Sequence, residues 1–131
     1  MYNLTNIIIV YAAFIIIDLA YLSTNFAKSN VNTQILAVQK ENLNMTPTKQ
    51  FASLFIWGFL LLGIHIFVKP LSQDNTSALL YGALYGLIVY LIFDLTNYVI
   101  FSNYTFKFLV LDVAWGVFLC SIINLLYFKL N

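Results

Sequence analysis

Three of the five acidic residues in this 131-residue chain lie inside long apolar segments. They are Asp18, Asp94 and Asp112, and each stands four to six residues from one end of its segment. In helices rising 1.5 Å per residue, the three carboxyl groups are expected about 6–9 Å from one end of the molecule. An aspartate in a bilayer costs about 2.5–3.5 kcal/mol at the helix centre, and less towards the interface. We therefore predict a shared polar site. The alternative is three separate side chains that fix helices together or extend to water.

Helix dipoles distinguish the three carboxyl groups. Asp18 and Asp94 stand near expected helix C-termini, where a negative charge is disfavoured, and Asp112 stands near an N-terminus, where it is favoured. No lysine lies deep in the apolar segments and the chain has no arginine, so no cation neutralises them there. The sequence thus predicts that Asp94 or Asp18 holds a proton or needs a cation, and that Asp112 ionises most readily.

Two further residues are predicted to belong to this site. Asn97 follows Asp94 by about one helical turn, and Trp115 follows Asp112 at the same spacing. The indole N–H of Trp115 can donate to a carboxylate, although a packing role is the alternative. His65, the single histidine, lies near the other end of its segment, so we predict an interfacial role and no metal site. Catalytic residues are unknown, and no cofactor is predicted.

The composition defines the elements that must position these residues. Hydrophobic residues make up 62% of the chain and charged residues 8%, against about 25% charged in soluble domains. A soluble globule, a disordered chain and a nucleic-acid-binding protein are excluded. Four apolar segments can cross a bilayer as helices, at about 4–24, 51–68, 77–98 and 108–128. The predicted fold is an all-α membrane protein: one integral membrane domain over 1–131, folded as a four-transmembrane-helix bundle.

Local signals support these boundaries and add one element. Thr46 and Pro47 are typical of a helix start. Residues 75–77 offer caps for the third span, and Asn103 or Thr105 offers one for the fourth. The segment 25–45 is polar, with apolar residues at helical spacing: Ala27, Val31, Ile35 and Val38. A short amphipathic helix on the membrane surface is predicted between the first two spans. The alternative is an irregular loop.

Four crossings place both termini on one side of the membrane. The other side then carries residues 25–50 and 99–107 with four lysines, against two lysines on the side of the termini. This small excess favours a cytoplasmic location for the 25–50 loop.

Small residues define one face of the third predicted span. Ala78, Gly82 and Gly86 repeat every four residues, and Tyr90 and Asp94 continue the series. Such a stripe lets another helix approach closely, so Gly82 and Gly86, together with Gly116 of the fourth span, are predicted packing residues. A homo-oligomer through the Ala78, Gly82 and Gly86 face is a second interpretation.

The two halves of the chain resemble each other. The sequence Ile-Ile-Ile-Asp-Leu at 15–19 is similar to Leu-Ile-Phe-Asp-Leu at 91–95, and Trp57-Gly58 is echoed by Trp115-Gly116. Two hairpins in parallel orientation would give this pattern. Chance similarity between apolar segments is the alternative.

The segment Tyr-Leu-Ile-Phe-Asp-Leu-Thr-Asn at 90–97, with Leu-Asp-Val-Ala-Trp-Gly at 111–116, resembles the signature of the domain of unknown function 2177 family. Asp18, Lys69-Pro70 and the Ala-Leu-Leu-Tyr-Gly-Ala sequence at 78–83 agree with its pattern. The polar segment between the first two spans is longer than the family's, and Lys69 stands where an arginine is expected. The resemblance implies a multi-pass membrane protein and supplies no reaction.

These observations favour the handling of a small molecule, an ion or a proton at Asp18, Asp94 and Asp112. One alternative is a membrane enzyme or accessory factor in lipid modification, with the aspartates near the headgroups as an acid/base or metal site. A structural membrane subunit is the other. The sequence leans against an enzyme, and the expected partners are the lipid bilayer and a second copy of the chain.

Overall fold

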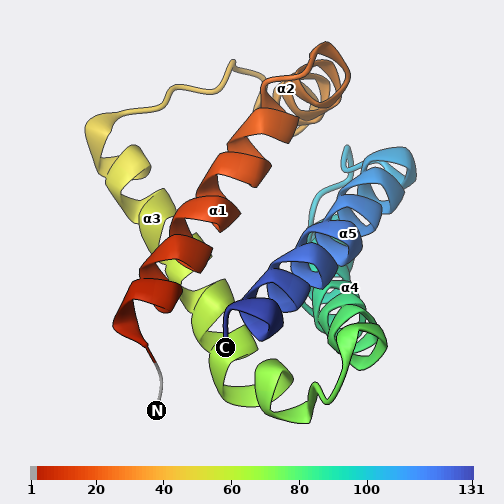
Figure 1. The fold of residues 1–131 in the computed structure, drawn as a ribbon. Coiled ribbons are helices and arrows are strands. Elements are labelled where there is room, and N and C mark those ends of the chain that lie inside the picture. Colours follow the sequence, from red (N-terminus) through yellow and green to blue (C-terminus); the bar gives the residue numbers. More distant parts are fainter. Residues whose placement is uncertain (1–2) are drawn as a thin grey trace.

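The computed structural model describes residues 3–131, and every regular element in this part of the chain is helical (Figure 1). The five α-helices are α1 (Leu4–Leu22), α2 (Asn25–Gln39), α3 (Pro47–Gly63), α4 (Asn75–Ile100) and α5 (Phe106–Leu130). A π-helical turn, η1 (Ile64–Val68), and a 3₁₀ turn, η2 (Lys69–Leu71), prolong α3. All-helical architecture is therefore confirmed.

Four of these helices are long and apolar enough to cross a membrane, as predicted. They are Leu4–Leu22, Pro47–Leu71, Asn75–Ile100 and Phe106–Leu130. The last three extend beyond the predicted apolar segments because polar caps lie further out. Thr46 and Thr105 accept the backbone N–H groups of Lys49 and Phe108, at 3.3 and 3.2 Å. The cap of α4 is Asp74 rather than a residue of 75–77, because its carboxylate accepts the Ser77 N–H.

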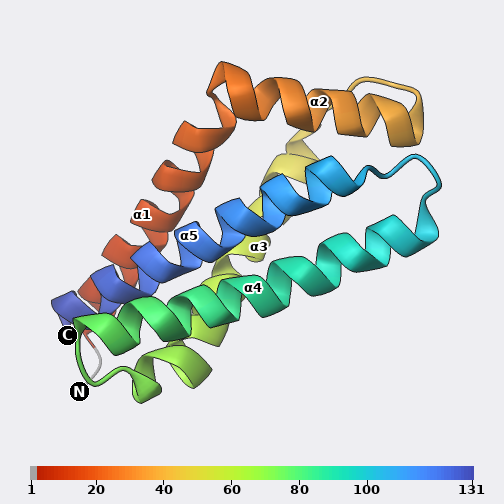
Figure 2. The same ribbon diagram turned by 90° about the vertical axis from the view of Figure 1, so that its right-hand side faces the viewer.

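The polar segment after α1 contains a helix only in its first part. α2 has 15 residues and ends at Lys40, whose φ of 64° is left-handed, and no helix covers residues 40–46. In Figure 2, α2 lies over the end of the molecule at which α5 begins. Gln34 fixes it there: its side chain is buried and bonds both Asn103 and Thr105 of the connection between α4 and α5.

α4 and α5 form the most tightly packed pair (Figures 1 and 2). A Cβ atom on Gly86 would lie 2.3 Å from the carbonyl oxygen of Gly116, and one on Gly82 would lie 2.6 Å from that of Cys120. The stripe of Ala78, Gly82 and Gly86 is buried under α5 in the monomer. A homo-oligomer through this same face would therefore require α4 and α5 to separate.

The four long helices do not close into a regular bundle along their whole length. The Cα atoms of α3 approach within 8 Å of α1 but not of α4 or α5, which contact the η1 turn instead. Figure 1 shows the first part of α3 diverging from the α4–α5 pair. A buried core joins α1, α3, η1 and α5: Val10, Phe14, Trp57, Leu61, Ile64, Val68, Leu119, Cys120, Ile123 and Tyr127. The diverging part of α3 leaves a gap between α3 and the α4–α5 pair. Across this gap, the Tyr85 hydroxyl of α4 donates to the Leu60 carbonyl of α3 at 3.2 Å.

Candidate functional site

The three aspartates lie at comparable depths in their helices. Asp18 stands four residues before the end of α1, Asp94 six before the end of α4, and Asp112 six after the start of α5. These separations correspond to about 6–9 Å along the helix axes. The three carboxyl groups nevertheless have different surroundings.

Two tryptophans hold the carboxylate of Asp18. The indole N–H of Trp57 donates to Oδ2 at 2.9 Å, and that of Trp115 donates to Oδ1 at 2.8 Å. The ring of Tyr21 stacks on Trp115 with 3.8 Å between centroids, which fixes the orientation of the indole. Since Trp57 belongs to α3 and Trp115 to α5, this carboxylate links α1 to both helices.

Asp94 is completely buried on the α4 face that packs against α5. One of its oxygens, Oδ1, accepts a hydrogen bond from the hydroxyl of Tyr104, a buried residue of the α4–α5 connection. The other oxygen, Oδ2, is buried and has no hydrogen-bond partner. Burial, with the neighbouring Asp94 carboxyl as the second cause, raises the pKa of Tyr104, so this tyrosine stays protonated and remains a donor.

Asp112 lies close enough to Asp94 for the two carboxyl groups to interact. Carboxylates only accept hydrogen bonds, so a bond between these two groups requires one of them to carry a proton. Asp112 is only half-buried, whereas Asp94 is inaccessible. The pair thus consists of an enclosed carboxyl group and one that reaches a surface of the protein.

Tyr90 lines the same cavity as Asp112. Its ring packs on the backbone of Gly116, where an added Cβ atom would come within 2.2 Å of the ring. The glycine therefore makes room for the aromatic ring.

The predicted site residues form two neighbouring clusters. Trp115 joins Asp18, whereas Asn97 joins the Asp94–Asp112 pair through the Tyr104 hydroxyl, which its side chain can reach. Sequence reasoning did not include Trp57 or Tyr104 in the site. The echo of Trp115-Gly116 at Trp57-Gly58 was a signal for Trp57. Nothing in the sequence singled out Tyr104, because helical periodicity does not extend into a connecting loop.

A network around Gln34 holds the loop that carries Tyr104. Its amide N–H donates to the Asn103 carbonyl at 3.1 Å, and its amide oxygen accepts from the N–H and hydroxyl of Thr105 at 3.0 and 2.8 Å. Asn103 and Thr105 flank Tyr104 in the sequence. The position of the Tyr104 hydroxyl against Asp94 therefore depends on α2.

A cavity of about 230 Å³ opens beside Asp112, in the gap between α3 and the α4–α5 pair. Its lining residues are Ile56, Leu60, Val89, Tyr90, Phe93 and Asp112. Ile56 and Phe93 are about 60% exposed, so they border the opening of the cavity on the surface of the molecule. Asp112 supplies the only carboxyl group in this lining.

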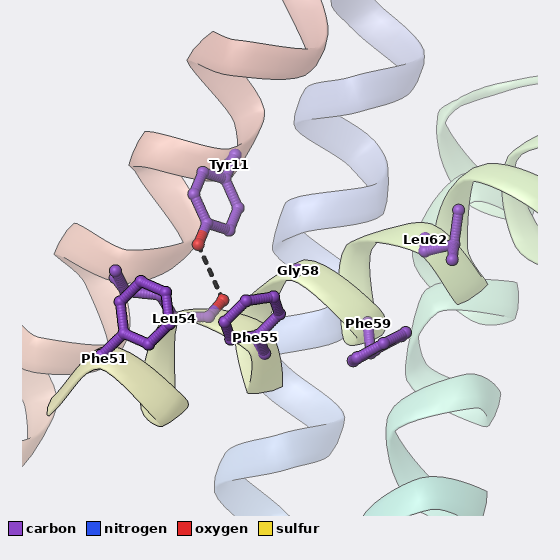
Figure 3. A pocket seen from close by; sticks show the side chains of 7 residues that line it. All are labelled: Tyr11, Phe51, Leu54, Phe55, Gly58, Phe59 and Leu62. Atoms are coloured by element: carbon purple, nitrogen blue, oxygen red, sulfur yellow. Dashed lines mark hydrogen bonds between the residues drawn. The ribbon is translucent and has the colours of Figure 1, made fainter. Parts of the chain in front are cut away.

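A larger apolar cavity of about 360 Å³ lies between α1 and α3 (Figure 3). Its lining contains no acidic or basic side chain: Tyr11, Phe51, Leu54, Phe55, Gly58, Phe59 and Leu62. The Tyr11 hydroxyl donates to the Leu54 carbonyl at 2.7 Å (Figure 3). This cavity therefore offers no charged group to a ligand.

His65 lies apart from the aspartates. Its Nδ1 atom is 2.5 Å from the hydroxyl of the buried Tyr127 in α5. Within residues 3–131, no three His, Cys, Asp or Glu side chains are arranged so that they could hold a metal ion. The aspartate layer is therefore a set of carboxyl groups with aromatic hydrogen-bond donors.

Residues 3–128, which include all three aspartates of this site, match the model of the family described as Predicted membrane protein (DUF2177). The chain belongs to this family. No curated protein and no solved structure matches it. Membership confirms the resemblance found in the sequence, and with the four apolar helices it identifies an integral multi-pass membrane protein of the family. The activity has to be inferred from the site itself.

Proposed function

We propose that this membrane protein binds and transfers a proton at the Asp94–Asp112 carboxyl pair, as part of moving a small molecule or ion. The observation that carries the proposal is the Oδ2 atom of Asp94, which is buried and has no hydrogen-bond partner, in a carboxyl group that interacts with that of Asp112. A buried acceptor without a donor costs about 1–3 kcal/mol, and more when it is charged. A proton shared with Asp112 removes that cost.

The surroundings of the pair support a proton rather than a fixed counter-ion. α4 contains no basic residue that could neutralise Asp94. Tyr104 occupies Oδ1 and leaves Oδ2 without a hydrogen-bond partner. Asp112 is the half-buried member, so it can exchange the proton with the outside while Asp94 stays enclosed.

A proton also fits the chemistry of the site better than a divalent metal ion. Calcium and magnesium take six or more oxygen ligands, and the described residues offer no group of three metal-binding side chains. Both oxygens of Asp18 are already engaged by indole N–H groups. We therefore assign Asp18 the role of positioning α1 beside the pair.

The proposal includes a placement in the membrane. α2 would lie on the membrane surface at the end that carries the aspartates, on the cytoplasmic side according to the lysine count. Both termini would lie on the opposite side. The contact between Asn6 and the Leu130 carbonyl, 2.5 Å apart near opposite ends of the chain, supports a common side for the two.

Infrared difference spectroscopy of the purified protein in lipid membranes tests the proton site. A pH change should alter the carbonyl band of a protonated carboxylic acid, and Asp94→Asn should remove this change. Asp74→Asn, at an exposed carboxylate outside the membrane spans, should leave the band as it is in the wild type. If the band of Asp94→Asn changed with pH in the same way as that of the wild type, Asp94 would only fix the packing of helices, as in a structural subunit.

A further inference from the structure

The cavity beside Asp112 combines three properties that together restrict what it can bind. Its walls are apolar, from Ile56 and Leu60 of α3 and Val89 of α4. Two aromatic rings, Tyr90 and Phe93, complete the α4 wall. The third property is the carboxyl group of Asp112, which lies about 9 Å along α5 from the start of the helix.

Each property restricts the occupant. Apolar walls at this depth exclude a strongly hydrated ion, which would lose its water without replacement. A lone carboxyl group favours a positive charge. Aromatic rings attract quaternary and alkyl ammonium groups through their negatively charged faces. A lipophilic ammonium ion, with a cationic head and a hydrocarbon tail, satisfies all three at once.

We propose that the cavity between α3 and α4 binds lipophilic ammonium ions from the bilayer, with the cationic head at Asp112 and the tail between Ile56 and Phe93. This inference rests on the proposed proton site, because Asp112 belongs to the carboxyl pair. When the cation binds, the proton shared by the pair leaves to the aqueous phase. One positive charge thus replaces another, and the net charge of the site stays the same.

The divergence of α3 gives the ligand a route from the bilayer. Tyr85 bridges α4 to Leu60 nearer the η1 turn, and α3 makes no close backbone contact with α4 or α5 beyond this bridge. The exposed side chains of Ile56 and Phe93 face the surroundings on either side of the gap. An amphiphile can therefore enter laterally and needs no aqueous channel.

Binding of radiolabelled decyltrimethylammonium to the protein in nanodiscs of phosphatidylethanolamine and phosphatidylglycerol tests this inference. Its permanent charge makes the proton balance unambiguous. We expect saturable binding above empty nanodiscs, release of one proton per bound cation, and weaker binding at acidic pH. Asp112→Asn, which keeps the shape of the side chain, should weaken binding by roughly tenfold or more because the cation loses its partner. Decanol, with the same tail and no charge, should not compete.

A pair of tryptophan substitutions supplies a matched control. Ile56→Trp should obstruct the opening of the cavity, whereas Ile16→Trp adds the same bulk at an equally exposed position of α1 that lines no described cavity. Binding that persists in both Asp112→Asn and Ile56→Trp would overturn the inference, and so would binding without proton release.

If the infrared band of the carboxyl pair titrates but the cation does not bind saturably, the inference fails and the proton site stands. If the cation binds at Asp112 but no band titrates, the proton proposal fails.

Discussion

Trp57 and Trp115 donate their indole N–H groups to the two oxygens of one carboxylate, that of Asp18. They belong to α3 and α5, whose Cα atoms do not come within 8 Å of each other. The carboxylate of α1 therefore joins two helices that make no close backbone contact. This arrangement fixes α3 at the edge of the gap beside Asp112.

The two hydrogen bonds from Trp57 and Trp115 to Asp18 should each contribute to the free energy of unfolding. Trp57→Phe and Trp115→Phe each keep an aromatic ring but remove one donor. Hydrogen bonds to charged groups contribute about 1.5–3 kcal/mol, and we expect losses near the lower limit because Asp18 is half-buried. SDS-induced unfolding in mixed micelles measures the change.

A double-mutant cycle separates this hydrogen bond from packing. Asp18→Leu removes the acceptor, so the further loss caused by Trp115→Phe in that background should be much smaller. Equal losses in both backgrounds would mean that Trp115 stabilises the protein only through its contact with Tyr21.

Tyr104→Phe should destabilise the protein by about 1–3 kcal/mol, because it leaves the buried Oδ1 atom of Asp94 without the hydroxyl that donates to it. Burial and the Asp94 carboxyl raise the pKa of Tyr104 in the folded protein. Its contribution to stability is therefore complete below the ordinary tyrosine pKa of about 10 and is lost as pH rises towards the folded value. The difference in unfolding free energy between wild type and variant should shrink in alkaline solution. A difference independent of pH would refute this role of the phenol.

Gly86→Ala and Gly58→Ala should have opposite effects. A Cβ atom at position 86 would lie 2.3 Å from the carbonyl oxygen of Gly116, so α4 and α5 must move apart. Overpacking of this kind costs about 1–3 kcal/mol. At position 58 the nearest atom is 4.0 Å away, and alanine favours a helix over glycine by about 1 kcal/mol. Thermal unfolding in detergent compares the two, and a tolerated Gly86→Ala would contradict the close approach of α4 and α5.

Asp74→Asn isolates the charge of one helix cap. The backbone N–H of Ser77 donates to the Asp74 carboxylate at 2.7 Å and lowers the pKa of Asp74. The stabilisation due to its charge is therefore present above about pH 4 and disappears as pH falls through the lowered value. Asparagine caps a helix as well but does not titrate. The variant should lose this part of the acid dependence of unfolding, and an unchanged acid dependence would show that Asp74 does not supply it.

The sequence by itself determined the four apolar helices and the depth of the aspartates. Both follow from one-dimensional information, because an apolar segment must form a helix in lipid and each residue advances it by a fixed distance. The spacing of Ala78, Gly82 and Gly86 likewise indicated a face of close packing. Membership of the family could be inferred from the Asp-Leu-Thr-Asn and Asp-Val-Ala-Trp-Gly sequences.

Only the tertiary structure decided which residue each aspartate meets. Asp18 pairs with indoles 39 and 97 residues away, and Asp94 pairs with a tyrosine from a loop. Such partners depend on how the helices are rotated and tilted against one another, and helical periodicity does not specify either angle. The divergence of α3, which creates the cavity beside Asp112, has the same origin. It results from packing around the η1 turn and Tyr85, and no spacing within α3 predicts it.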